Sequence, residues 1–496
     1  MWTANVFESA ASYKDACAVP RSGRDLEGKS FPDQPGSTLI EKFWLRSWTE
    51  ETYLFYTEVT DRDPNLFGDR LAYFSQLRTF AVTPSGEDKD EFHFSEPTDA
   101  YLAASIAAPT AGYGVSFEVE SNTAPRSYTV RYVNPGTPAA QEVGGVANFV
   151  RGERIISIDG ADFVNGNDTD TLTDGLFPEN PGEMHSFVLE DGNGVRRTVS
   201  VTSANVTPDP VNAVRTISTG TGKVGYIFFN TFTPVTAEDE LVDAVTQLAT
   251  ENVTDLVLDL RYNGGGLIAI ASQLAYMVAG SGPTAGNTFE RLRFNDAAGT
   301  INPVTGQANQ PFPFYDTGLG FSVPNGQALP TLNLGRVFVL STENTCSASE
   351  TVINGLRGVD VEVILIGDTT CGKPFGFYPT DNCGETYFTI QFQGVNDKGF
   401  GDYTDGFVPM NSAFPFGVKL PGCQVADDLD RPIGMATDPL LDAALDYRAL
   451  GTCPPPTTRA VQLSQPAGGF SKGEPLTQRG NIFDTNRDLR MPGDFE

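Results

Sequence analysis

The sequence predicts a multidomain protein of mixed α/β class (α+β overall), in which an α/β core follows a helical segment and a β-rich module. Residues 39–57 carry aromatic side chains at three- and four-residue spacing, which is typical of an amphipathic helix. Residues 109–207 contain short alternating runs separated by turn residues, which indicates a small β module. From residue 223 onward, continuous apolar runs alternate with amphipathic segments, as parallel sheets covered by helices require.

The composition is that of a globular protein and argues against two classes of partner. The chain has 496 residues, of which 40% are hydrophobic and 19% charged, so about two to four domains are expected. Its 63 acidic and 33 basic residues give a net charge of −30, which repels nucleic acid and anionic membrane surfaces. No apolar run is long enough to span a bilayer. We interpret the charge as a solvated acidic surface.

The first part of the chain divides into two segments. Residues 1–35 are rich in Gly, Pro, Ser and charge and predict an extended N-terminal arm. Residues 36–108 predict a helical domain, with helices over 39–59 and 68–77. His93 alternates with aromatic residues, and we expect a packed histidine at a domain junction.

The second part, residues 109–207, predicts a β-rich domain. Turns at 134–136, 159–160 and 191–192 separate its apolar runs. The expected strands are residues 113–119, 128–133, 154–158, 186–190 and 197–202.

The third part, residues 208–453, predicts the α/β core. The expected strands are 223–232, 255–260, 289–294, 335–340, 361–367 and 387–392, and the expected helices are 237–251, 267–278, 351–357 and 439–448. Residues 281–335 are rich in Gly, Pro and Asn and are long for a loop, so we expect a lid or part of a cleft. Residues 454–496 lack periodicity and predict an extended or partly disordered tail.

The segment 346–373 carries the clearest chemistry. Ser347 lies among small residues before a predicted helix, and Lys373 follows an apolar strand. A serine hydroxyl needs a base to become a nucleophile, but the two histidines of the chain, His93 and His185, lie far upstream. A lysine acts as that base when burial lowers its pKa from about 10.4 towards neutrality. The helix and strand would bring Lys373 back beside Ser347, which predicts a nucleophile and base.

The sequence Ser-Ala-Ser-Glu at 347–350, followed by Gly-Lys at 372–373, resembles the signature of tail-specific, or carboxyl-terminal processing, proteases (serine peptidase family S41). The resemblance implies a serine endopeptidase with an S41-type catalytic domain over 208–453, in which Ser347 is the nucleophile and Lys373 the general base. It implies no metal and no cofactor. Ser349 would lie at the helix start and bond to backbone, and Glu350 would be a first-turn helix charge.

A glycine-rich turn at 261–266 follows the predicted strand 255–260. Such turns also bind phosphate, but neither a following Lys-Ser/Thr nor a GxGxxG pattern is present. The turn resembles the S41 motif Asp-Leu-Arg-Asn-Asn-Pro-Gly-Gly, in which the position of Gly264 is a proline in many relatives and has no N–H to donate. The backbone N–H groups of Gly265 and Ala348 are therefore the expected oxyanion donors, worth on the order of 3 kcal/mol each.

The sequences VNPGTPAA and VRGERIISIDGADF, within 133–163, resemble a PDZ domain. The resemblance implies a peptide-binding domain over 109–207 whose carboxylate-binding loop is Tyr113, Gly114, Val115, Ser116 and Phe117. Such a loop directs backbone N–H groups at a terminal carboxylate, and the strand edge accepts the peptide as an extra strand. The expected partners are unfolded or C-terminally tagged protein substrates. The alternative is a PDZ-shaped spacer with a blocked groove.

One position departs from the family pattern. Many relatives have a glutamine four residues after the lysine that helps to orient it, but this chain has Phe377, so a Ser-Lys-Gln triad is not expected. The departure keeps open a second interpretation, a catalytically inactive protein that binds peptides through a PDZ and a protease fold. A third is a Ser/Lys esterase or amidase acting on small substrates.

The six cysteines favour an oxidising compartment. None shows the CxxC spacing of a metal site, and an even number permits complete pairing. Together with the low lysine content, this favours export to the periplasm or the cell exterior. The first 20 residues lack an apolar signal core, so either an export signal has been removed or the protein is cytoplasmic, and we expect export. The expected pairs are Cys371–Cys383, Cys423–Cys453 and Cys17–Cys346.

Overall fold

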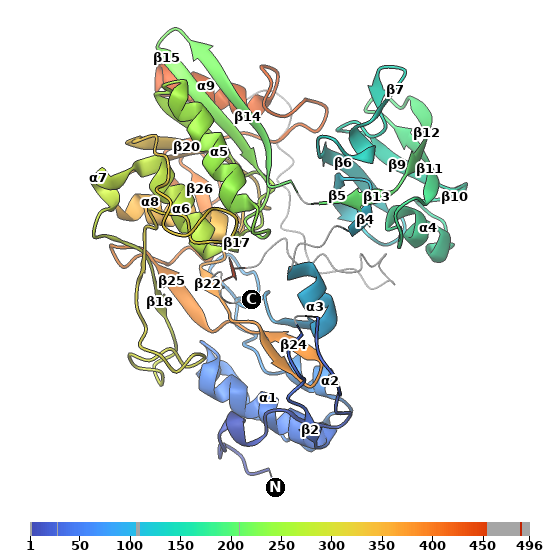
Figure 1. The fold of residues 1–496 in the computed structure, drawn as a ribbon, viewed down its shortest axis with the longest axis vertical. Helices are drawn as coiled ribbons and strands as arrows, with labels where there is room; N and C mark the ends of the chain where they lie inside the picture. The colour runs from blue at the N-terminus through green and yellow to red at the C-terminus, as the bar shows by residue number, and fades with distance from the viewer. Residues whose placement is uncertain (1, 27, 106–109, 208, 454–486, 489–496) are drawn as a thin grey trace.

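The structure is a computed structural model of the chain and describes residues 2–26, 28–105, 110–207, 209–453 and 487–488. Its centre is a six-stranded sheet (Figure 1) in which five strands are parallel and β14 is antiparallel at one edge. In spatial order the strands are β14 (Val211–Thr219), β15 (Gly222–Phe229), β16 (Asp255–Asp259), β20 (Arg336–Ser341), β21 (Glu362–Gly367) and β28 (Gly422–Gln424).

Helices cover both faces of this sheet. Helices α5 (Ala237–Thr250), α6 (Ile268–Ala279) and α8 (Ala348–Gly358) pack with Leu256 and Leu258 on one face. Helix α9 (Pro439–Leu450) packs with Val257 on the other face. Successive strand residues therefore point to opposite apolar layers, which is why the central strands have apolar residues at consecutive positions, such as Leu256, Val257 and Leu258. The predicted α/β core is confirmed.

Two parts of the core differ from the sequence prediction. The strand expected over 387–392 is two strands, because β24 (Glu385–Phe388) pairs with β23 (Thr380–Asn382) and β3 (Phe94–Pro97), whereas β25 (Phe392–Val395) pairs with β18 (Thr288–Arg293) and β22 (Phe375–Gly376). The chain changes sheets between them. The long segment 281–335 contains α7 (Ser281–Thr284), β18 and β19 (Phe312–Pro313), and its apolar side chains Phe314, Val323 and Leu329 are buried in the main core.

The N-terminal helices pack on an aromatic cluster. Helix α1 (Thr38–Thr52) begins at Ser37, whose Oγ accepts the N–H of Ile40 at 3.3 Å, and helix α2 (Arg70–Phe74) follows. Both predicted helices are present and shorter than expected. Trp44 and Trp48 stack with ring centres 5.2 Å apart, and both contact Tyr387 of β24. The strand pair β3–β24 and this cluster join the N-terminal helices to the core.

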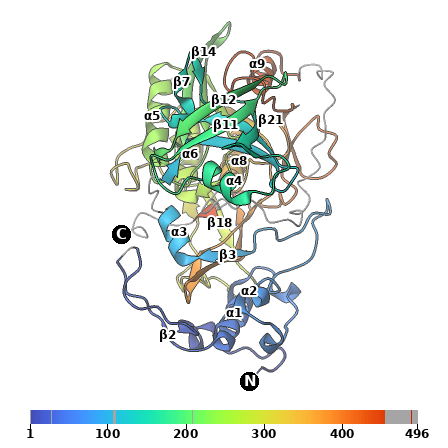
Figure 2. The ribbon, with the colours of Figure 1, turned by 90° about the vertical axis from the view of Figure 1, so that its right-hand side faces the viewer.

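The N-terminal arm is fastened to the hairpin β23–β24. Strands β1 (Ala16–Cys17) and β2 (Gln34–Pro35) pair in parallel. Lys14 Nζ donates to the carbonyl of Asp381 at 2.8 Å, and the N–H of Asp15 donates to Asn382 Oδ1 at 2.8 Å. The arm therefore follows the surface of the molecule at these residues, as Figure 2 shows for β2.

The β module consists of the strands and helix between β4 and β13, which pair with each other where the chain enters and leaves it. Its sheet has the order β12-β11-β9-β6-β5, so β5 is an edge strand, and β10 pairs with β9. Helix α4 (Thr169–Leu176), which the sequence did not predict, buries Leu172 and Leu176 in the module's own core. The strands are β4 (Thr110–Gly112), β5 (Val115–Ser121), β6 (Ser127–Val133), β7 (Glu142–Val143), β8 (Val146–Ala147), β9 (Arg154–Ile158), β10 (Ala161–Asp162), β11 (Met184–Glu190), β12 (Arg196–Thr202) and β13 (Ala204–Val206).

The remaining described elements lie around the core. They are α3 (Thr98–Ser105), β17 (Gly266–Leu267), β26 (Phe407–Pro409), β27 (Val418–Leu420) and β29 (Arg487–Asp488). Strand β29 pairs in parallel with β17, and the rest of the tail expected over 454–496 lies outside the described residues. Within the described ranges, no helix combines the length and apolar character needed to cross a bilayer.

Candidate active site

Ser347 lies where the chain turns from β20 into α8, at one edge of the central sheet. β20 ends at Ser341, and Ser347 directly precedes Ala348, the first helical residue. Its φ of 58° and ψ of −112° lie outside the regions that residues with side chains normally occupy, so the turn is strained. The Oγ atom is buried and makes no hydrogen bond of standard geometry, although it faces the backbone N–H of Glu350 in the capping box of α8. A buried hydroxyl without a partner is uncommon and marks a candidate reactive group.

Lys373 reaches the same edge because β21 runs parallel to β20, and the carboxyl ends of neighbouring parallel strands meet. The residue is fully buried, and its Nζ lies 4.4 Å from the ring centre of Phe92 and 4.7 Å from that of Phe377. Burial lowers the pKa of Lys373 to about 7, although the charges of Asp90 and Glu350 act in the opposite direction. At neutral pH, a large share of this amine is therefore unprotonated and able to accept a proton.

A buried carboxylate joins the serine loop to the lysine loop. Glu350 accepts the backbone N–H of Ser347 at 3.1 Å and the backbone N–H groups of Gly372 and Lys373, each at 2.8 Å. The hydroxyl of Thr370 donates to the same carboxylate at 2.6 Å. Burial raises the pKa of Glu350 to about 7, and these donors favour its charged form. Glu350 thus fixes the backbone of Ser347 relative to that of Lys373, a role beyond the first-turn charge predicted for it.

The N-terminal part contributes two residues beside the lysine that the sequence did not single out. Phe92 covers Lys373 Nζ on one side, and Asp90 is fully buried and accepts the hydroxyl of Tyr53 at 2.6 Å. Phe377, the position at which the sequence departs from the expected pattern, covers the amine with its ring. No sequence motif links these positions, because they lie almost 300 residues apart.

The glycine turn is held against the serine loop by Asn263. The carbonyl of Asn263 accepts the N–H of Cys346 at 3.0 Å and the hydroxyl of Ser349 at 2.9 Å, so the Ser349 hydroxyl bonds to backbone as predicted. Gly265, with a φ of 116°, occupies a conformation that favours glycine, and its N–H donates to Asn263 Oδ1 at 3.0 Å. The N–H of Ala348 lies in the first turn of α8, where backbone donors have no acceptor within the helix.

Three disulfides link all six cysteines, in the pairs Cys17–Cys383, Cys346–Cys371 and Cys423–Cys453. The predicted pair Cys423–Cys453 is confirmed, whereas the predicted pairs Cys371–Cys383 and Cys17–Cys346 are wrong. The reason is the sheet order. β20 and β21 are neighbours, so the loops that follow them meet and bring Cys346 to Cys371, while the hairpin β23–β24 carries Cys383 to the N-terminal arm.

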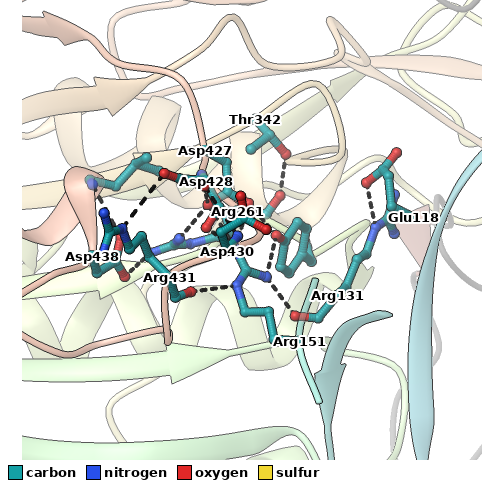
Figure 3. A network of polar contacts seen from close by, with 12 residues as sticks. Glu118, Arg131, Arg151, Arg261, Thr342, Asp427, Asp428, Asp430, Arg431 and Asp438 are labelled. Carbon is teal, nitrogen blue, oxygen red and sulfur yellow. Dashed lines mark hydrogen bonds and ion pairs between the residues drawn. The ribbon is translucent and has the colours of Figure 1, made fainter. Parts of the chain in front are cut away.

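A buried ionic network lies directly before the glycine turn (Figure 3). Arg261 is fully buried between Asp259 at 2.7 Å, Asp438 at 2.6 Å and Asp427 at 2.8 Å. Arg151 of the β module also contacts Asp427, at 2.8 Å. Burial alone would raise the pKa of Asp427, but the two guanidinium groups hold it at about 2. The Thr342 hydroxyl donates to the carbonyl of Arg261, so this network also contacts the loop that leads to Ser347.

The predicted carboxylate-binding loop lies at the start of the edge strand β5. Tyr113 is buried, and its hydroxyl donates to the carbonyl of Gly175 in α4 at 2.9 Å, which ties the loop to that helix. Gly114 has a φ of 75°, and a Cβ at this position would lie 2.4 Å from the side chain of Thr137. Only glycine therefore fits here without a shift. Val115, Ser116 and Phe117 belong to β5 itself and are partly exposed.

The two histidines lie in other environments. His93 is packed face to face with Phe74, with ring centres 3.9 Å apart, and its ring nitrogens contact Thr389 Oγ1 at 3.0 Å and the carbonyl of Phe74 at 2.9 Å. Burial lowers its pKa. The expected packed histidine between the N-terminal part and the core is confirmed. His185 contacts Asp159 in the β module at 2.7 Å.

Comparison with known proteins agrees with this fold. Residues 223–381 match the sequence model of peptidase family S41. The matched part extends from within β15 to within β23 and contains both Ser347 and Lys373. No curated protein sequence matches the chain.

The chain is similar to solved structures of two proteins described as proteases, the first of which is described as an S41 protease. One, from Bacteroides fragilis, is 24% identical with a TM-score of 0.59, over 82% of this chain and 97% of the other. The photosystem II D1 C-terminal processing protease is 20% identical with a TM-score of 0.45, and the match covers 82% of this chain and 100% of that protease. The first of these likenesses supports the S41-type fold.

Proposed function

We propose that this protein is a serine endopeptidase that uses Ser347 as nucleophile and Lys373 as general base. The observation that carries the proposal is the buried amine of Lys373, because burial lowers its pKa to about 7. The backbone N–H groups of Lys373 and Ser347 both donate to the carboxylate of Glu350. A buried neutral lysine is the group that an S41 domain without a nearby histidine requires as its base. The strained turn and the unpartnered Oγ of Ser347 support its role as nucleophile.

The proposed reaction begins when Lys373 Nζ takes the proton of Ser347 Oγ as the oxygen attacks the carbonyl carbon of a peptide bond. The N–H groups of Gly265 and Ala348 stabilise the resulting oxyanion. For Gly265 this requires its N–H to exchange the bond to Asn263 Oδ1 for one to substrate. The lysine ammonium then protonates the leaving amine, and a water molecule hydrolyses the acyl-enzyme with Lys373 again acting as base. Ser347 Oγ has no partner here, so its bond to Lys373 must form when substrate binds.

We further propose that the β module selects substrates through their C-terminal residues. The edge position of β5 supports addition of a peptide strand, and the positive φ of Gly114 is typical of a loop whose backbone N–H groups turn towards an anion. Strand β17 directly follows Gly265 and already pairs with a second extended segment, β29. This pairing supports binding of the scissile region of a substrate as an extended strand.

The test combines a chemical label with turnover. Wild type should react with a fluorophosphonate at Ser347 and cleave a denatured protein substrate, while Ser347→Ala should do neither. Ser281→Ala, which removes an exposed hydroxyl, is the matched control and should keep both the label and the cleavage. Absence of label and of cleavage in folded wild type would contradict the proposal.

The second candidate function is a peptide-binding protein with an inactive protease fold. Its supporting observations are the buried Ser347 and the Gly265 N–H that already donates to Asn263. Binding of C-terminal peptides without fluorophosphonate labelling would favour it. A Ser/Lys esterase or amidase would label but would cleave small esters or amides and no protein.

A further inference from the structure

One disulfide lies between the two proposed catalytic residues. Cys346 directly precedes Ser347, and Cys371 lies two residues before Lys373, with 5.2 Å between the two Cα atoms. Cys346 is buried at 1% exposure, and Cys371 is half-buried. The other two disulfides join the N-terminal arm to the hairpin β23–β24 and β28 to the segment after α9. Of the three disulfides, only Cys346–Cys371 links the serine loop to the lysine loop.

The same two loops are joined by Glu350, so the disulfide and the carboxylate form one clamp. Both sulfur atoms and a Glu350 carboxylate oxygen lie within 4.8 Å of one another. Glu350 Oε2 lies 3.4 Å from Cys371 Sγ and accepts the N–H groups of Ser347 and Lys373. A movement of Cys371 away from Cys346 therefore also changes the hydrogen bonds that fix the proposed nucleophile and base.

We propose that the Cys346–Cys371 disulfide is a positioning element for the Ser347/Lys373 pair, so that peptidase activity requires this bond and is switched off reversibly by a dithiol. The inference rests on the proposed function. The reductant's thiolate attacks the half-buried Cys371 sulfur, Cys346 leaves as thiolate and takes up a proton, and the second thiol of the reductant releases Cys371. Each cysteine gains one electron and one proton, and the dithiol becomes a cyclic disulfide.

The effect follows from the space that two thiols need. Bonded sulfur atoms lie about 2 Å apart, whereas non-bonded heavy atoms rest at about 3.5–4 Å. Reduction therefore separates the two loops by roughly 1.5 Å in a closely packed region. A misplacement of about 1 Å at a catalytic group lowers turnover about 100-fold. The substrate-binding strands β5 and β17 do not carry these cysteines, so kcat should fall while KM changes little.

The experiment compares two double variants of the full chain. Cys346→Ala/Cys371→Ala removes the covalent link without adding the bulk of two thiols, so its kcat should lie between those of oxidised and reduced wild type, with a KM within about 3-fold of wild type and no further loss with a dithiol. The matched control, Cys423→Ala/Cys453→Ala, removes a disulfide that does not contact the site and should keep wild-type kcat together with the dithiol response. The pH at which kcat reaches half of its maximum should shift in Cys346→Ala/Cys371→Ala and stay unchanged in Cys423→Ala/Cys453→Ala.

Wild type provides the measurement that does not depend on refolding a variant. It is titrated with dithiothreitol while mass spectrometry follows each disulfide, circular dichroism follows the fold, and activity is recorded before and after reoxidation. Activity should fall in step with loss of the Cys346–Cys371 bond and return with it. Full activity in folded protein with this bond reduced, or wild-type kcat in Cys346→Ala/Cys371→Ala, would overturn the inference alone. An oxidised wild type that neither labels nor cleaves would instead overturn the proposed function.

Discussion

The free energy of unfolding of wild type should rise with pH more steeply than that of Lys373→Met. The folded protein releases the Lys373 proton at about pH 7, against an ordinary value of 10.5 for lysine. Between these values the unfolded chain holds more protons, so this group makes the folded state more stable as pH rises. Below pH 7 the buried amine is charged, and its desolvation destabilises the fold. Methionine has a similar length, no charge and no such dependence.

The size of the effect follows from the shift. Each pKa unit corresponds to about 1.4 kcal/mol, so between pH 6 and pH 9 wild type should gain about 2–3 kcal/mol relative to Lys373→Met. Urea unfolding monitored by the fluorescence of Trp44 and Trp48, both buried in the N-terminal helical cluster, measures this difference.

Lys398→Met removes an exposed lysine and controls for the change in net charge. The argument would be refuted if the difference in free energy of unfolding between wild type and Lys373→Met stayed constant from pH 6 to pH 9. Such a result would mean that burial does not neutralise the amine. The activity of wild type should rise across the same range, with half of its maximum near pH 7.

The remaining predictions concern the base, the module and the cysteines. Lys373→Arg should lose activity as completely as Lys373→Ala, about 100-fold or more, because arginine stays protonated at working pH; turnover of a denatured substrate checks this. Gly114→Val should weaken capture of free-acid peptides by about 1–3 kcal/mol, because its Cβ meets Thr137 at 2.4 Å. Amidation of the peptide C-terminus should weaken capture in the same way. Gly112→Val should leave capture unchanged, because a Cβ at Gly112 has no neighbouring atom within 4 Å. Non-reducing mass spectrometry of natively produced protein should find no free thiol.

The regular core was predictable because its sequence pattern and its packing agree. The strand 255–260 contains a continuous apolar run, and helices such as 237–251 are amphipathic, so the hydrophobic pattern alone located them. Helix α4 was missed because its sequence, TDTLTDGL, is rich in Thr and Asp and has low helix propensity. It forms because Asp168 caps it and because Leu172 and Leu176 pack into the module core. Tertiary contacts supply what the local sequence lacks.

The candidate site was predictable where it follows a local motif and not where it depends on long-range contacts. Ser347 and Lys373 lie within one motif, and neighbouring parallel strands bring them to one edge. The roles of Asp90 and Phe92 depend on docking of the N-terminal part against the core, which no periodicity reveals. The cysteine pairs could not be predicted for a similar reason. The order of strands in the sheet decides which loops meet, and the spacing of cysteines along the chain does not reveal that order.

The carboxylate of Asp427 has a consequence for how this architecture can be recombined. It is shared by Arg151 of the β module and Arg261 of the core. Deleting the module, or exchanging it for one without a matching guanidinium, would remove one of the two counter-charges of a buried ion. A functional chimera would therefore have to transplant Arg151 with its module, or replace Asp427 at the same time. The two parts are separate in sequence, but they can be exchanged only as a matched pair.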